Sequence, residues 1–162
     1  MKARFNLARM AAVLVCGGLA VAACGSQSSA KPTTTHSPTA AMVVKTATVK
    51  IDGKSQTILT DANGSPLYYF TADKSGKVTC TGQCATMWPP LTMPSGASKP
   101  EAPAAIHGTL GVVSSGDGAK VITYNGWPMY TYSKDKASGE PTGQGADGHK
   151  WAVITPTVQP AS

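Results

Sequence analysis

The stretch Asn63-Gly64-Ser65-Pro66-Leu67-Tyr68-Tyr69-Phe70-Thr71-Ala72-Asp73-Lys74 has a second copy 62 positions later. That copy reads Asn125-Gly126-Trp127-Pro128-Met129-Tyr130-Thr131-Tyr132-Ser133-Lys134-Asp135-Lys136. Downstream, Trp151 echoes Trp88, and the segment 142–146 echoes 81–85 at an offset of 61. Two units of about 60 residues are each too small to bury much apolar surface alone, so we expect them to share one core.

Short apolar segments separated by turn signals surround both copies. Asp52-Gly53 and Asn125-Gly126 are typical of type I′ turns, which need a positive φ at both central residues. No helical periodicity is visible. The sequence predicts strands over 43–51, 56–60, 67–70, 109–114, 121–124, 129–132 and 151–155.

We therefore expect a mainly β fold with two pseudo-repeats of short antiparallel strands sharing one small core, after a disordered tether. The all-β domain spans 42–162, with repeats near 58–94 and 121–156. The Pro- and Ala-rich stretch 95–105 is the expected connector between the two halves.

The N-terminus has the pattern of a lipoprotein signal peptide over 1–23. A basic start is followed by an apolar run that ends in Val21-Ala22-Ala23-Cys24, which is typical of a lipobox. The run from Met10 to Ala23 is shorter than the roughly 20 residues that a membrane-spanning helix needs. We expect cleavage before Cys24, lipid on that cysteine, a disordered Ser/Thr/Pro tether over 24–41, and attachment to the extracytoplasmic face of the cell membrane.

The charge gives no reason to expect a nucleic-acid partner. Cleavage before Cys24 would remove three basic residues and no acidic one, so the formal net charge falls from +6 to +3. The remaining lysines are spread singly rather than clustered. We expect a monomer without a cofactor.

The repeated Tyr-x-(Phe/Trp/Tyr)-x-x-Asp pattern resembles a family of bacterial lipoproteins defined by that motif, known as a secreted repeat of unknown function. Tyr68, Phe70 and Asp73 match in the first copy, and Tyr130, Tyr132 and Asp135 match in the second. The Cys80–Trp88 segment and the Tyr124-to-Pro128 stretch are also similar to the family. The resemblance covers about 59–154 and implies two repeats in the cell envelope, without a catalytic or ligand-binding assignment.

The motif residues have a structural interpretation and a binding interpretation. On a strand, Tyr68 and Phe70 share one face and would pack on the core, while Asp73 would open a turn and accept backbone hydrogen bonds. Alternatively, the aromatic residues form a glycan-facing platform with the aspartates as acceptors. The candidate residues are Tyr68, Phe70, Asp73, Tyr130, Tyr132, Asp135, Trp88 and Trp127, and we expect Trp127 and Trp151 to be largely shielded.

Cys80 and Cys84 are the only cysteines after Cys24, and in an oxidising compartment they predict a disulfide. A redox pair is the alternative, although three residues separate them instead of two. Another alternative is a soft metal site that combines Cys80 and Cys84 with Met87, Met93, His107 or His149. Asp117 and Asp147 stand in Gly-rich loops without the spaced carboxylates of a calcium loop.

No catalytic motif is visible, so we expect no enzyme. The sequence lacks the serine-hydrolase elbow, the phosphate loop and the dinucleotide fingerprint. The function expected is a non-enzymatic binding or cell-envelope interaction module, with an envelope polymer or protein as partner. The alternative is a redox or metal-handling lipoprotein using Cys80 and Cys84, and a glycan hydrolase using Asp73 and Asp135 is a third possibility.

Overall fold

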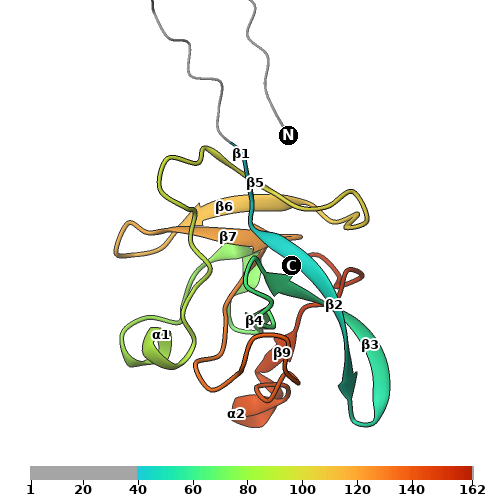
Figure 1. Cartoon of the computed structure of the whole chain (residues 1–162). Coiled ribbons are helices and arrows are strands. Elements are labelled where there is room, and N and C mark those ends of the chain that lie inside the picture. The colour runs from blue at the N-terminus through green and yellow to red at the C-terminus, as the bar shows by residue number, and fades with distance from the viewer. Residues whose placement is uncertain (1–39, 162) are drawn as a thin grey trace, which may run out of the picture. The chain divides into compact units, whose positions relative to one another are not determined.

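The computed structural model of the chain describes residues 40–161 (Figure 1). Cys24, the signal peptide and residues 24–39 of the expected tether lie outside the described residues. The first strand, β1 (Ala40–Met42), begins two residues before the expected start of the all-β domain at residue 42. It pairs in parallel with β5 (Lys99–Glu101), which lies inside the Pro- and Ala-rich connector.

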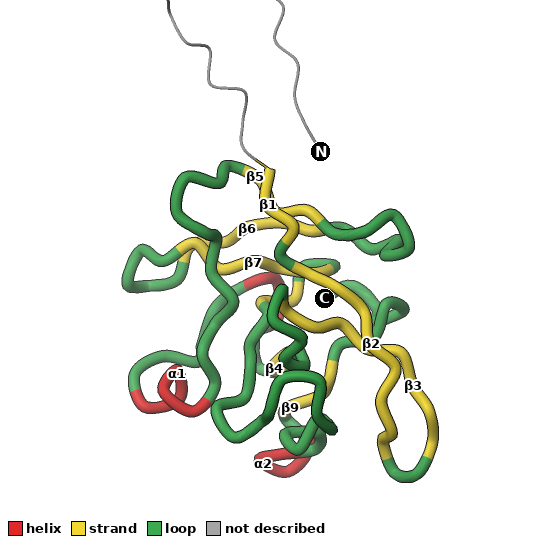
Figure 2. Tube along the Cα trace, in the orientation of Figure 1, coloured by secondary structure: helices red, strands yellow, loops and turns green. Residues whose placement is uncertain are grey.

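Two antiparallel hairpins carry most of the strand residues. In the first, β2 (Val44–Ile51) pairs with β3 (Lys54–Asp61). In the second, β6 (Leu110–Ser114) pairs with β7 (Lys120–Tyr124), which also pairs with β8 (Trp127–Pro128). Figure 2 shows that loops and turns join these short strands. The mainly β prediction is confirmed.

The two turns predicted as type I′ have the expected backbone angles. Asp52 and Gly53 both have positive φ between β2 and β3, as do Asn125 and Gly126 between β7 and β8. This is the backbone requirement of a type I′ turn. The segment 129–132, expected as a strand, instead makes isolated bridges, in which Tyr130 pairs with Tyr68 and with Pro90.

The third antiparallel pair joins the two repeats. β4 (Tyr68–Phe70) belongs to the first repeat and pairs with β9 (Trp151–Val153) at the end of the second. The bridge between Pro90 and Tyr130 is its counterpart, because the end of the first repeat there pairs with the second. Each repeat therefore donates its last segment to the other.

Backbone hydrogen bonds follow the same exchange. Leu67 N–H donates to the Leu59 carbonyl at 3.0 Å, and Ile154 N–H donates to the Leu67 carbonyl at 2.8 Å. In the second repeat, Met129 donates to Ile122 at 3.0 Å and Leu91 donates to Met129 at 2.8 Å. Since neither repeat completes its own sheet, the two share a single folded unit.

The core contains two apolar clusters. One gathers aliphatic residues with Tyr124, and the other gathers the motif aromatics with Cys80 and Ile58. Three short helical turns lie between strands: η1 (Lys74–Gly76), α1 (Gln83–Met87) and α2 (Ala146–His149). In Figure 1, α1 and α2 lie at the end of the domain away from β6 and β7.

Candidate functional site

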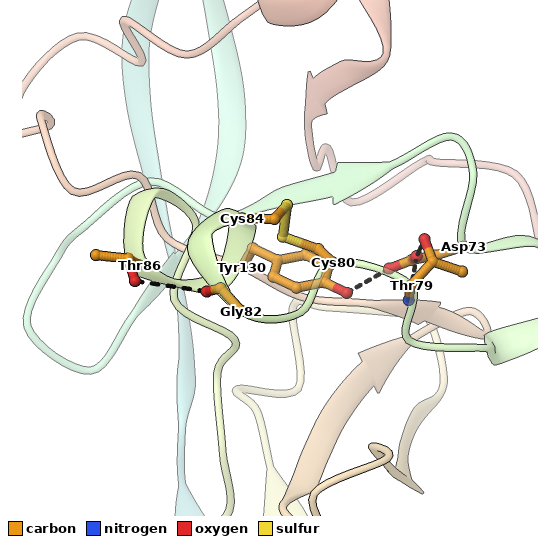
Figure 3. Close-up of a disulfide and its surroundings, with 7 residues drawn as sticks. All are labelled: Asp73, Thr79, Cys80, Gly82, Cys84, Thr86 and Tyr130. Carbon is orange, nitrogen blue, oxygen red and sulfur yellow. Dashed lines mark hydrogen bonds between the residues drawn. A yellow bond between two sulfur atoms is a disulfide. The ribbon is translucent and has the colours of Figure 1, made fainter.

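The motif tyrosines and aspartates bond reciprocally across the two repeats. The Tyr68 hydroxyl donates to the Asp135 carboxylate at 2.5 Å, and the Tyr130 hydroxyl donates to the Asp73 carboxylate. Figure 3 shows the Tyr130 ring directing its hydroxyl toward Asp73. The main chains of the two tyrosines also exchange hydrogen bonds of 2.8 and 2.9 Å, so they are direct neighbours.

A threonine donates two further hydrogen bonds to each carboxylate. Thr79 donates its backbone N–H to Asp73 at 2.8 Å and its hydroxyl at 2.5 Å. Thr142 does the same to Asp135, at 3.0 and 2.5 Å. Each aspartate therefore accepts a backbone hydrogen bond, together with a cross-repeat bond that the sequence pattern did not indicate.

The two phenols are held in their protonated form. Burial raises the pKa of Tyr68 and of Tyr130, and the adjacent Asp135 and Asp73 carboxylates raise each further. Neither tyrosine side chain nor Asp73 is exposed to solvent. A buried carboxylate is tolerated here because it accepts several hydrogen bonds.

Four aromatic rings form one column through the second apolar cluster. Phe70 stacks on Trp151 at a centroid distance of 4.4 Å, Trp151 on Trp88 at 3.9 Å, and Trp88 on Tyr132 at 4.2 Å. The two tryptophans are buried, whereas the end rings Phe70 and Tyr132 are half-buried. Tyr68 meets Trp88 edge-on at 5.3 Å.

Trp127 lies apart from this column. It is partly buried, packs on Tyr69 at 4.7 Å, and donates its indole N–H to the Gln159 carbonyl at 2.8 Å. The C-terminal segment that covers it carries no repeat signal, which is why its environment differs from that of Trp151. Trp151 is shielded as expected, with an exposed fraction of 2%.

The structural register of the duplication differs from the sequence echo. Thr142 is the counterpart of Thr79, 63 positions earlier, and Gly145 before α2 is the counterpart of Gly82 before α1. The apparent match between 81–85 and 142–146 is therefore wrong by two residues. Six positions separate Asp73 from its threonine but seven separate Asp135 from its own, and this one-residue difference hides the threonines from a sequence comparison.

Cys80 and Cys84 form a disulfide with their Cα atoms 5.2 Å apart. Cys80 is buried in the aromatic cluster, and Cys84 is half-buried at the start of α1. The second repeat has Gly143 at the position of Cys80. The disulfide is thus a feature that distinguishes the first repeat.

A hollow of about 400 Å³ opens beside the disulfide. One wall carries Cys80 with the apolar Val78, Ala85 and Pro90, and the other is the β6–β7 turn with Ser115 and Asp117. Asp117 accepts hydrogen bonds from the Ser115 hydroxyl and from the Ala119 N–H at 3.0 Å, and these lower the pKa of its carboxyl. We call this the disulfide hollow.

The duplication builds a second hollow of about 210 Å³ at the equivalent place. Its walls include Pro141 and Gln144, which lie 63 positions after Val78 and Thr81, and the β2–β3 turn with Asp52. We call it the hairpin hollow. Both hollows therefore lie between a repeat's loop and the other repeat's hairpin turn, and both carry an aspartate on that turn.

The residues of the metal-site alternative do not converge in the described part of the chain. Met93 packs on the aliphatic core, Met87 is exposed and accepts a hydrogen bond from Ser133, and His107 and His149 are exposed. Across residues 40–161, no group of three or more His, Cys, Asp or Glu side chains has a geometry that could hold a metal ion. Asp147 forms an ion pair with Lys150 at 3.2 Å.

The two motif aspartates lie outside both hollows. Asp73 is buried, and Asp73 and Asp135 do not line the hollows beside the disulfide and the β2–β3 turn.

In the described residues, no helix is both long enough and apolar enough to span a bilayer.

Comparison with known proteins gives one match. Residues 49–92 and 111–155 match the family described as a secreted repeat of unknown function, whereas no curated protein and no solved structure matches the chain. Each matched unit starts about ten residues before the repeat expected from the sequence, because it includes part of the preceding hairpin strand, β2 or β6. Together the two units cover more than half of the sequence, so the chain belongs to this family of secreted repeats.

Proposed function

We propose that the protein is a lipid-anchored extracytoplasmic binding module whose two hollows hold amine-bearing groups of a cell-envelope polymer or protein. The observation that carries this proposal is the pair of hollows at equivalent positions of the two repeats, each with an aspartate on its hairpin turn. The motif tyrosines and aspartates hydrogen-bond to one another in the core. The surface hollows are therefore the better candidates for ligand recognition.

The chemistry of the hollows favours a cationic group on a short apolar body. Asp117 and Asp52 supply negative charge, and Val78, Ala85 and Pro90 supply apolar contact in the disulfide hollow. Hydrogen bonds from Ser115 and Ala119 lower the pKa of Asp117 and so favour its charged form. The hairpin hollow also contains Lys50 and Glu140, so the two hollows would differ in affinity.

Membrane attachment is the second part of the proposal. The lipobox ending at Cys24 and the secreted character of the family support export followed by lipidation. A lipid chain contributes about 0.8 kcal/mol per buried methylene, so multiple acyl chains would hold the protein on the membrane. We expect Cys24→Ser to leave an unprocessed precursor. Normal processing and lipid labelling of that variant would show that another residue carries the anchor.

The binding proposal is tested by amide-resonance titration of the exported chain with n-pentylamine, using n-pentanol as the neutral control. We expect saturable shifts at residues 78–85 and 115–117 and, more weakly, at 50–52 and 141–144. Asp117→Asn should abolish the first set and Asp52→Asn the second, while Asp147→Asn, outside both hollows, should change neither. Shifts that are absent, or equal with pentanol, would refute recognition of a cation by these hollows.

Native mass spectrometry of the same protein separates this function from the redox or metal-handling alternative. A mass two hydrogens below the reduced chain, without a metal adduct, supports the binding module. A reduced species that carries metal would instead assign the function to Cys80 and Cys84.

A further inference from the structure

The aromatic cluster combines two features that the binding proposal does not use. Its tyrosine hydroxyls donate to carboxylates, and its tryptophan rings connect those tyrosines to a half-buried ring at the surface. Phenols and indoles are the side chains of this chain that lose a single electron most readily, apart from sulfur. Both residue types can therefore carry electrons through this cluster.

The rings form a continuous path without an intervening layer of aliphatic side chains. Tyr132 stacks on Trp88 at 4.2 Å, Trp88 on Trp151 at 3.9 Å, and the planes of the two indoles are 3° apart. Tyr68 contacts Trp88 edge-on at 5.3 Å, and Tyr130 contacts Trp151 edge-on at 5.2 Å. Phe70 at the far end is much harder to oxidise, so Tyr132 is the end at which electrons would leave.

Each buried tyrosine has a proton acceptor in place. Oxidation of a phenol makes its proton strongly acidic, and in an apolar core a charged radical cation would be costly. Asp135 lies 2.5 Å from the Tyr68 hydroxyl oxygen, and Asp73 accepts the Tyr130 hydroxyl. Neither carboxylate forms an ion pair among the described residues, so no side-chain cation competes with the transferred proton.

We propose that this cluster is an electron relay in which Tyr68 and Tyr130 are the internal electron donors and Asp135 and Asp73 the proton acceptors. A one-electron oxidant in the extracytoplasmic space, such as an oxidised metal complex or an oxygen-derived radical, takes one electron at Tyr132. That electron is replaced through Trp88 from Tyr68, or through Trp151 and Trp88 from Tyr130.

The step conserves charge and atoms. The Tyr68 O–H bond breaks, its electron passes to the oxidant, and its proton forms an O–H bond on Asp135. The products are the reduced oxidant, a neutral tyrosyl radical and a protonated aspartic acid. The same step at Tyr130 protonates Asp73. The raised pKa of both tyrosines agrees with this coupling. It means that loss of the proton alone is disfavoured, so the proton leaves together with the electron.

The test uses the full exported chain and photogenerated tris(bipyridine)ruthenium(III) as the oxidant, with radicals trapped by freezing and identified by electron paramagnetic resonance. Ring-deuterated tyrosine separates tyrosyl from tryptophanyl signals. We expect a tyrosyl radical whose signal shows a hydrogen bond from the protonated aspartate, and in the Tyr68→Phe/Tyr130→Phe double variant only the signal of a Tyr132 radical, which lacks that bond. Tyr69→Phe should retain the signal, because Tyr69 packs on Trp127 outside the relay.

A second variant separates proton acceptance from packing. In the Asp73→Asn/Asp135→Asn double variant the tyrosines remain without a proton acceptor, and we expect the hydrogen-bonded tyrosyl signal to be lost while signals of Tyr132 and of the tryptophans remain. In the unmodified protein, the tyrosyl radical should form more slowly in deuterated water than in ordinary water, because a proton moves in the same step. A tyrosyl signal with the aspartate hydrogen bond that survives in the tyrosine double variant, or that is absent from the unmodified protein, would overturn the relay.

Discussion

The indole rings of Trp88 and Trp151 stack with their centroids 3.9 Å apart and their planes 3° apart. One ring comes from the end of the first repeat and the other from the end of the second. Since both are buried, the centre of the aromatic cluster is the contact between the repeats. Disrupting either repeat should therefore destabilise the whole domain.

Removal of a motif aspartate should destabilise the fold, and more strongly in the first repeat. Asp73→Ala would leave the buried Tyr130 hydroxyl and both Thr79 donors without their acceptor. An unsatisfied buried polar group costs about 1–3 kcal/mol, and we expect a loss near the upper end of that range. Asp135→Ala should cost less because Asp135 is half-buried. Urea unfolding of the two variants measures the difference, and equal losses would contradict the role of burial.

Alkaline pH should destabilise the domain through the two buried tyrosines. Their pKa values are raised above the ordinary 10.0, so the folded state holds the phenol protons more tightly than the unfolded chain. The resulting stability is fully present below about pH 10 and is lost as the pH rises above that value. Unfolding free energies between about pH 8 and pH 11 should show this fall.

The matched variants for this pH series replace tyrosine by phenylalanine. Tyr68→Phe/Tyr130→Phe should have a lower stability at neutral pH and a shallower alkaline decline. Tyr69→Phe, in which a half-buried ring is altered, should keep the decline of the unmodified protein. A stability that does not change across the range would show that the tyrosines titrate alike in both states.

A methyl group at Gly143 should not fit against the tryptophan stack. A Cβ at this position would lie 2.5 Å from the Trp88 ring, which cannot move away because Trp151 lies on one of its faces. Overpacking of this kind typically costs 1–3 kcal/mol, so we expect Gly143→Ala to be destabilised by about 2 kcal/mol. Gly116→Ala is the control, since nothing lies within 4 Å of its Cβ. A thermal unfolding comparison would refute the clash if both variants melt together.

The sequence predicted the architecture better than the site. Asp52-Gly53 and Asn125-Gly126 were sufficient for the turns that join β2 to β3 and β7 to β8, because turn geometry is a local property. The repeat signal likewise predicted one shared core.

The exchange of terminal segments could not be predicted, because two repeats that close on themselves and two that exchange ends have the same sequence pattern. The Tyr68–Asp135 bond spans 67 positions and depends on that exchange. The two hollows were missed for the same reason, since each is lined by residues from both repeats. Only a long-range contact between the repeats could have revealed them.

The exchange makes a final prediction about fragments of the domain. Leu91 completes the sheet of the second repeat through Met129, and Ile154 completes that of the first through Leu67. A chain cut at Gly96, an exposed loop position, gives two halves that each lack the partner for their terminal segment. We expect each half alone to be unfolded and an equimolar mixture to refold, with a rate that increases with concentration. Tryptophan fluorescence can follow the reaction, because stacking of Trp88 on Trp151 requires both halves. Cooperative unfolding of either half by itself would show that a single repeat can close its own sheet, and would contradict this prediction.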